Sequence, residues 1–86
     1  MKNSSVTVPW MEGLHSRPAA KLVLLARKYR ANIKLVCGEQ VANAGSIVSI
    51  LLLSAALGST IHLEVSGADE DQAMDAVVRV FADPEI

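Results

Sequence analysis

The residues best suited to chemistry lie together at positions 13–20, in the run Gly-Leu-His-Ser-Arg-Pro-Ala-Ala. His15 comes just before a segment with helical spacing, which places its imidazole beside the unpaired N–H groups and positive dipole end of a helix. A phosphoryl group on that ring would face those donors and Arg17, whose planar guanidinium binds phosphate oxygens in pairs. The same surroundings favour a neutral ring with a free lone pair, which nucleophilic attack requires. The run predicts a phosphoryl-accepting histidine; a plain helix cap is the alternative.

Two other side chains are weaker candidates. His62 stands among outward-facing residues of a predicted strand and is expected to be an ordinary solvated histidine. Cys37 has no neighbouring histidine, helix start or second cysteine, so we interpret it as an unreactive thiol in a hairpin turn. A metal site would need His15, Cys37 and His62 to converge from three separate elements, and we expect neither metal nor cofactor. A stand-alone phosphohistidine hydrolase is also disfavoured, because the run holds no evident general acid.

A helix is expected to begin at Ser16 and to carry the reactive run in its first turn. Pro18 suits that turn, where a missing N–H group is harmless. Arg27, Lys28 and Arg30 suit the negative end of the helix dipole. The apolar face recurs at helical spacing through Ala19, Leu22, Val23, Ala26 and Tyr29.

Strands and two further helices complete the pattern. Strands are predicted at 4–8, 33–36, 40–43 and 60–65, with a hairpin turn at 37–39. A second helix is predicted over 47–57, with Ser46 as its N-cap and Gly58 as its stop. A third should follow Asp69, with Gln72 completing a capping box and Pro84 ending it. Its apolar face comprises Ala73, Met74, Val77, Val78 and Phe81.

The order βαββαβα predicts an α+β fold, an open-faced sandwich. Its four-stranded antiparallel sheet should carry the three helices on one face and leave Thr7, Lys34 and His62 on the wet face. A chain of 86 residues forms one domain, residues 1–86.

Composition excludes several classes of protein. The chain is 51% hydrophobic with one cysteine, which argues against disorder and an internal disulfide framework. The longest apolar stretch, 47–57, is too short to span a membrane, and no signal peptide is apparent, so we expect a cytoplasmic protein. The net charge of −1 disfavours nucleic acid, but it hides a basic half, 1–38, and an acidic half, 39–86. The basic half could dock an acidic protein surface; ordinary solvated faces are the alternative.

The run from Gly13 to Ala19 resembles the active-site signature Gly-Leu-His-x-Arg-Pro-Ala of the HPr family, histidine-containing phosphocarriers of the bacterial sugar phosphotransferase system. The likeness extends over nearly the whole chain, including 43–47 and 67–70. It implies that Nδ1 of His15 takes a phosphoryl group from enzyme I and donates it to enzyme IIA domains. It implies that Arg17 clamps the phosphate and that the backbone of Ser16 and Arg17 binds it.

The resemblance also implies a regulatory site at Ser46, which an ATP-dependent HPr serine kinase modifies in some lineages. Gly45 departs from the basic residue that often precedes this serine, which puts that regulation in question. Glu12 is a second departure, since a carboxylate near the phosphate would repel it and shorten the life of the phosphorylated state.

A docking surface is expected on the first two helices, as an apolar patch with a basic rim that includes Arg17. About half of the aliphatic residues involved could instead belong to the core. The candidate docking residues are Ala20, Lys21, Leu24, Arg27, Ile47, Val48, Leu51 and Leu52.

We expect the protein to be a monomer. Two alternatives for its function remain open. The chain could serve a nitrogen-related or regulatory branch in place of sugar uptake. It could also be an interaction module that controls a partner through Ser46 and the apolar patch without transferring phosphate, although an intact His15 with Arg17 argues against this.

Overall fold

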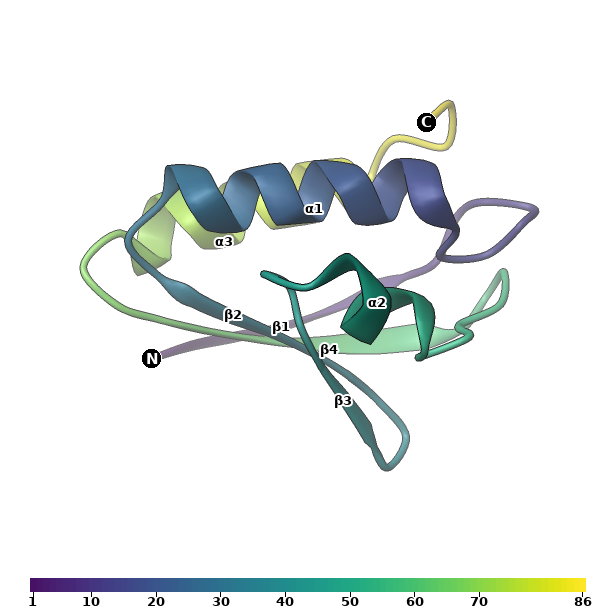
Figure 1. The fold of residues 1–86 in the computed structure, drawn as a ribbon, viewed down its shortest axis with the longest axis horizontal. Helices are drawn as coiled ribbons and strands as arrows, with labels where there is room; N and C mark the ends of the chain where they lie inside the picture. The colour runs from purple at the N-terminus through teal and green to yellow at the C-terminus, as the bar shows by residue number, and fades with distance from the viewer.

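Four strands form one antiparallel sheet in the order β1-β4-β2-β3 in the computed structural model, which describes residues 1–86. The elements follow the predicted βαββαβα order (Figure 1). They are β1 (Lys2–Thr7), α1 (Ser16–Lys28), β2 (Asn32–Cys37), β3 (Gln40–Asn43), α2 (Ile47–Leu51), β4 (Thr60–Ser66) and α3 (Glu70–Phe81). The open-faced sandwich is therefore confirmed.

The central strands alternate between a buried and an open face. Ile61, Leu63 and Val65 of β4 are buried, and Leu35 of β2 pairs directly with Leu63. The helices cover this side of the sheet, with α1 and α3 lying next to each other (Figure 1). This two-layer arrangement buries the apolar face of each element against the other layer.

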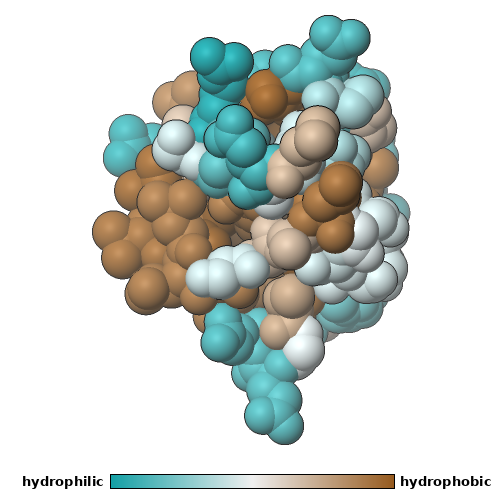
Figure 2. Space-filling model, turned by 90° about the vertical axis from the view of Figure 1, so that its right-hand side faces the viewer, coloured by the Kyte–Doolittle hydropathy of each residue, from teal (hydrophilic) through white to brown (hydrophobic).

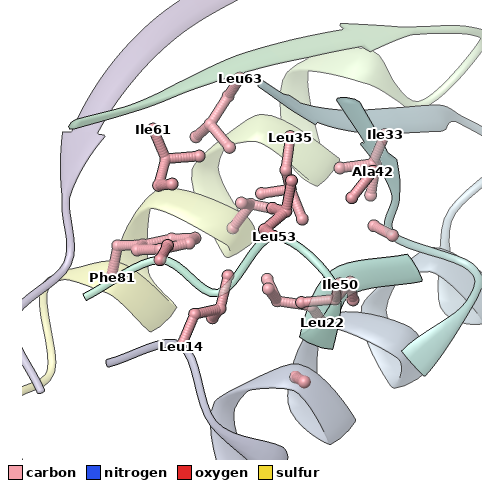
Figure 3. Packing of buried hydrophobic residues seen from close by; sticks show 14 of the residues in the cluster. Leu14, Leu22, Ile33, Leu35, Ala42, Ile50, Leu53, Ile61, Leu63 and Phe81 are labelled. Carbon is pink, nitrogen blue, oxygen red and sulfur yellow. The ribbon is translucent and has the colours of Figure 1, made fainter. Parts of the chain in front are cut away.

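The core gathers the predicted apolar faces of the helices and strands. Figure 3 shows Leu22 of α1 and Phe81 of α3 pointing toward the sheet residues Leu35 and Ile61. Leu14, from the loop before α1, enters the same cluster and is buried. No polar or charged side chain is buried in the core, and burial of Leu14 helps to hold the loop before α1 in place.

Helix α2 ends at Leu51, so the prediction of a helix over 47–57 was wrong. Leu53 and Ser54 donate backbone hydrogen bonds to carbonyls three residues back, and Ser54 adopts a φ of +50°. Leu53 and Ala55 are both buried, and residues two positions apart do not lie on one face of a helix, so burying both requires the chain to leave it. The Ala55 carbonyl then accepts a 2.8 Å hydrogen bond from the Leu14 N–H group.

The predicted capping box at Asp69 was also wrong. Asp69 is the N-cap residue of α3, but its side chain accepts a 2.8 Å hydrogen bond from the backbone N–H of Arg30. Glu70 instead accepts a bond from the Gly67 N–H group. Asp69 therefore ties the start of α3 to the loop after α1, a role that spacing along the chain does not reveal.

Smaller differences concern element ends. Strand β1 begins and ends earlier than predicted, although Val8 still exchanges backbone hydrogen bonds with the segment 58–59. Helix α1 ends at Lys28, so Arg30 lies beyond it. Cys37 is the last residue of β2, opposite Gln40, and the tight turn is formed by Gly38 and Glu39.

Candidate functional site

The loop before α1 is shaped by Gly13. Its φ is +73°, and a Cβ atom at this position would overlap the carbonyl oxygen of Ala55, so only glycine fits without strain. Its N–H group donates to the Trp10 carbonyl at 2.9 Å, and the next residue, Leu14, donates to the Ala55 carbonyl. The loop is thus pinned on both sides of Gly13, which sets where the following residue must point.

His15 is the N-cap residue of α1, as predicted, and its side chain is half-buried. Its Nδ1 atom lies 2.8 Å from the Gly13 carbonyl oxygen, which also accepts the backbone N–H of His15 at 2.9 Å. A carbonyl oxygen can only accept, so the proton of the neutral ring belongs on Nδ1. The lone pair then resides on Nε2.

Two N–H groups at the start of α1 have no partner. The first bond across the helix start runs from Ala19 to the His15 carbonyl, and Pro18 has no N–H group. The N–H groups of Ser16 and Arg17 therefore remain free, and no acidic side chain of the first turn competes for them. The positive dipole end adds to the attraction that these donors exert on an anion.

An open hollow of about 450 Å³ lies over the His15 ring. Arg17 and Glu12 border it, both exposed, and neither joins one of the two ion pairs of the chain. The segment after α3 closes another side with Pro84 and the half-buried Ile86. The free guanidinium suits an anion such as a phosphoryl group, and the open hollow leaves room for one.

Trp10 forms a wall of the hollow, and sequence reasoning overlooked it. Its ring stands edge-to-face with His15, with centroids 6.5 Å apart and planes at 79°. Its Nε1 donates a 2.7 Å hydrogen bond to the Asp83 carbonyl near the end of the chain. The signal that could have found it is compositional: it is the one tryptophan in the chain, five positions before His15.

Ser46 is the N-cap residue of α2, as predicted. Its Oγ atom accepts a 3.2 Å hydrogen bond from the Ser49 N–H group, and the side chain is half-buried. The preceding Gly45 is exposed and donates its N–H to the Asn43 side chain at 2.8 Å. The hydroxyl stands at the entrance of a helix of only five residues.

The predicted docking surface is apolar and exposed. Figure 2 shows a broad hydrophobic area on its left-hand side, the side on which α2 lies. The interior face of this region is supplied by Ile50 and Leu53, so the expectation that about half of the named aliphatic residues belong to the core was wrong. The exposed members are Leu24 at 63%, Ile47 at 39%, Val48 at 62%, Leu51 at 38% and Leu52 at 70%. The remaining predicted residues, Ala20, Lys21 and Arg27, are exposed on α1.

The other reactive side chains lie apart from this site. His62 stands on the open face of the sheet, half-buried, with Nδ1 3.4 Å from Ser5 Oγ. Cys37 is half-buried at the end of β2. No three histidine, cysteine or acidic side chains converge as metal ligands. None of the helices has both the length and the apolar character that crossing a bilayer demands.

Comparison with known proteins assigns the family. The family model for the PTS HPr component phosphorylation site matches residues 2–83. The chain belongs to the HPr family. Phosphocarrier protein NPr of Shewanella violacea is 43% identical over 72 residues, which cover 84% of this chain and 79% of that protein. Phosphocarrier protein HPr of Cupriavidus necator is 40% identical over 70 residues, covering 81% and 79%.

A solved HPr structure has the same architecture. HPr-C-His from Thermoanaerobacter tengcongensis superposes with a TM-score of 0.89 at 33% identity, covering 95% of this chain and 92% of that one. The family and the fold expected from the reactive run and the element order are both confirmed. The relatives include proteins called HPr and proteins called NPr, so similarity alone assigns this HPr-family protein to neither branch.

Proposed function

We propose that this HPr-family protein carries a phosphoryl group on His15, taken from enzyme I and passed to enzyme IIA domains. The carrying observation is the meeting of three features at one hollow. They are the His15 ring, the unpaired N–H groups of Ser16 and Arg17, and a guanidinium free of ion pairs. Each answers a requirement of the chemistry: a nucleophile, fixed donors and a mobile positive charge.

The transfer is a simple displacement at phosphorus. A ring-nitrogen lone pair forms the new nitrogen–phosphorus bond while the bond from phosphorus to the donor breaks, and the electron pair leaves with the donor. The charge of the phosphoryl group then lies against the free N–H groups of Ser16 and Arg17 and the Arg17 side chain. Each interaction with a helix end is worth typically about 0.3–1 kcal/mol, modest enough for the group to be passed on.

Use of Nδ1, which the family resemblance implies, requires the ring to turn. In the resting structure Nδ1 lies 2.8 Å from the Gly13 carbonyl oxygen. A phosphoryl group on Nδ1 in this orientation would collide with that oxygen and be repelled by it. The ring must rotate away from Gly13 and its proton must move to Nε2 before Nδ1 can attack. The order we propose is therefore rotation and tautomer exchange, then transfer.

Phosphoryl labelling tests the function. Incubation with phosphoenolpyruvate and enzyme I is expected to add one acid-labile, base-stable phosphate per chain. His15→Ala should abolish it, because His15 is the one imidazole at the hollow and a phosphate on the neighbouring Ser16 would be stable to acid. His62→Ala, a matched change on the open sheet face, should label normally. Labelling that survives His15→Ala would overturn the proposal.

The docking partner is proposed to be acidic with an apolar centre. The exposed aliphatic patch of α1 and α2 supplies the centre, and Arg17, Lys21 and Arg27 supply a basic rim that steers encounter. Comparison of labelling rates with a sugar-branch and a nitrogen-branch enzyme I separates the two roles. We expect transfer from the sugar-branch enzyme to be faster; preference for the other would assign the nitrogen branch.

Regulation through Ser46 is proposed as a second use of the chain. Its hydroxyl already accepts a bond from a helix N–H group, so a phosphate there would meet favourable donors and leave the fold intact. ATP with the HPr serine kinase is expected to label Ser46 and to leave Ser46→Ala unlabelled. If Ser46→Ala altered the cellular phenotype while His15→Ala did not, the interaction-module alternative would replace the carrier role.

A further inference from the structure

Trp10 is a buried residue that is fixed in place by contacts on two sides. It is 2% exposed, and its ring packs on Phe81 at the end of α3, with centroids 5.3 Å apart. Its Nε1 donates to the Asp83 carbonyl, a contact between residues 73 positions apart. One indole therefore links the loop before α1 to the segment after α3.

The same indole meets the His15 ring. The His15 side chain makes an edge-to-face contact with Trp10 and a hydrogen bond from Nδ1 to the Gly13 carbonyl. Edge-to-face aromatic pairs are stabilising beyond the area that they bury. The indole is itself immobilised, so the contact can restrict the orientation of a half-buried ring.

We propose that Trp10 is a positioning residue: anchored by Phe81 and the Asp83 carbonyl, it holds the His15 ring in the orientation in which Nδ1 donates to Gly13. This inference deepens the proposed function and rests on it, since ring rotation would precede transfer. Trp10 then sets how often Nδ1 is presented to a phosphoryl donor. The charged side chains that border the ring, Glu12 and Arg17, are both exposed. The buried indole of Trp10 is therefore the neighbour that is best able to fix the orientation of the ring.

The test measures the ring tautomer in the unphosphorylated protein. The ¹⁵N shifts of the His15 ring are recorded at about pH 9, where imidazoles are neutral. Wild-type protein is expected to hold mainly the Nδ1–H form. Trp10→Leu should lower the ratio of Nδ1–H to Nε2–H about five-fold, the scale of one lost edge-to-face aromatic pair. The ring of His62 provides the internal control and should not change.

A second variant keeps the proposal falsifiable if loss of the indole prevents folding. Trp10→Phe retains an aromatic ring beside His15 but removes the N–H group that anchors it, and the ratio should fall by about two-fold, less than in Trp10→Leu. Amide spectra establish that each variant is folded. A wild-type ring mainly in the Nε2–H form, or a ratio unmoved in folded variants, would overturn the proposal.

These measurements use no phosphoryl donor, so the two proposals can fail separately. Absent labelling of His15 with the expected tautomer shifts would remove the carrier function and leave the positioning role. Normal labelling with an unmoved tautomer ratio would remove the positioning role alone.

Discussion

At the scale of the residue, the carbonyl of Gly13 fixes the position of His15. It accepts both the backbone N–H and the Nδ1 atom of His15, and its position depends on a backbone conformation with φ of +73°. Glycine is required there for two separate reasons, the positive φ and the close approach of the Ala55 carbonyl. The glycine of the reactive run is therefore a structural requirement of the histidine that follows.

Gly13→Ala should destabilise the protein more than a positive-φ glycine alone would explain. We expect the free energy of unfolding to fall by about 3 kcal/mol or more, since strain and a backbone clash add. Gly38→Ala is the matched control: its φ is +62° but nothing lies near its missing Cβ, so about 1 kcal/mol is expected. Urea unfolding of both variants measures the difference. Equal losses would mean that the Ala55 contact does not constrain the loop.

At the scale of the element, the short helix α2 and the residues just after it contribute side chains both to the core and to the exposed apolar surface. Its interior residue Ile50 and the following Leu53 enter the core, while Val48 and Leu52 face outward. After the helix, the Ala55 carbonyl accepts a hydrogen bond from the loop before α1. The segment from α2 to Ala55 thus supports the histidine loop and carries part of the proposed docking surface.

Leu52→Ser should separate stability from partner binding. The side chain is 70% exposed, so the free energy of unfolding should change by no more than about 0.5 kcal/mol. If Leu52 anchors a partner, its loss should raise the Kd for enzyme I about ten-fold, as for a residue at the centre of an interface.

The control for this variant is Val36→Ser. Val36 of β2 is half-buried and pairs with His62 on the open face of the sheet, the face that the helices leave uncovered, so binding should not change. Titration calorimetry with enzyme I measures both. An unchanged Kd for Leu52→Ser would remove Leu52 from the interface.

At the scale of the whole molecule, ion pairs tie the edge strand β1 to α3. Lys2 Nζ lies 2.8 Å from Asp71, and the Met1 ammonium lies 3.1 Å from Glu70. The hydrogen bond and the charge of Asp71 raise the pKa of Lys2 above its ordinary value of 10.5. The same contact lowers the pKa of the Asp71 carboxyl below 3.8. Both side chains are exposed, so the contribution to stability is small.

Lys2→Met should therefore lower the Tm only within a window of pH. A carboxyl with a lowered pKa stabilises the folded state when the pH is above its pKa in the unfolded chain, and this stabilisation is lost as the pH falls through its pKa in the folded state. A lysine with a raised pKa stabilises the folded state below its pKa in the unfolded chain, and this stabilisation is lost as the pH rises through its pKa in the folded state. The difference from wild type should be greatest at about pH 5–9 and vanish below the lowered pKa of Asp71 and above the raised pKa of Lys2.

Thermal unfolding across this range measures the window, and Lys21→Met, an exposed lysine outside both ion pairs, is the control. A difference that persisted at pH 2 would assign the effect of Lys2 to packing. High salt should shrink the difference, because exposed pairs are screened.

Local sequence patterns were sufficient to predict the order of the elements and the position of the run 13–20 at the start of a helix. Apolar spacing places Leu22 and Val77 on buried helix faces, and strict alternation does the same for Ile61 and Leu63. The place of His15 and Arg17 at the start of α1 could be predicted because helix-start signals depend on neighbours along the chain. These features follow from interactions within a few residues, which a sequence displays directly.

The end of α2, the side-chain partner of Asp69 and the role of Trp10 depended on the tertiary structure. Asp69 bonds to Arg30 across 39 positions, and Trp10 bonds to Asp83 across 73. The Ala55 carbonyl, four residues beyond the end of α2, accepts a hydrogen bond from Leu14, another contact between distant segments. Backbone groups must find partners wherever packing brings them, and spacing along the chain carries no record of which distant segments will meet.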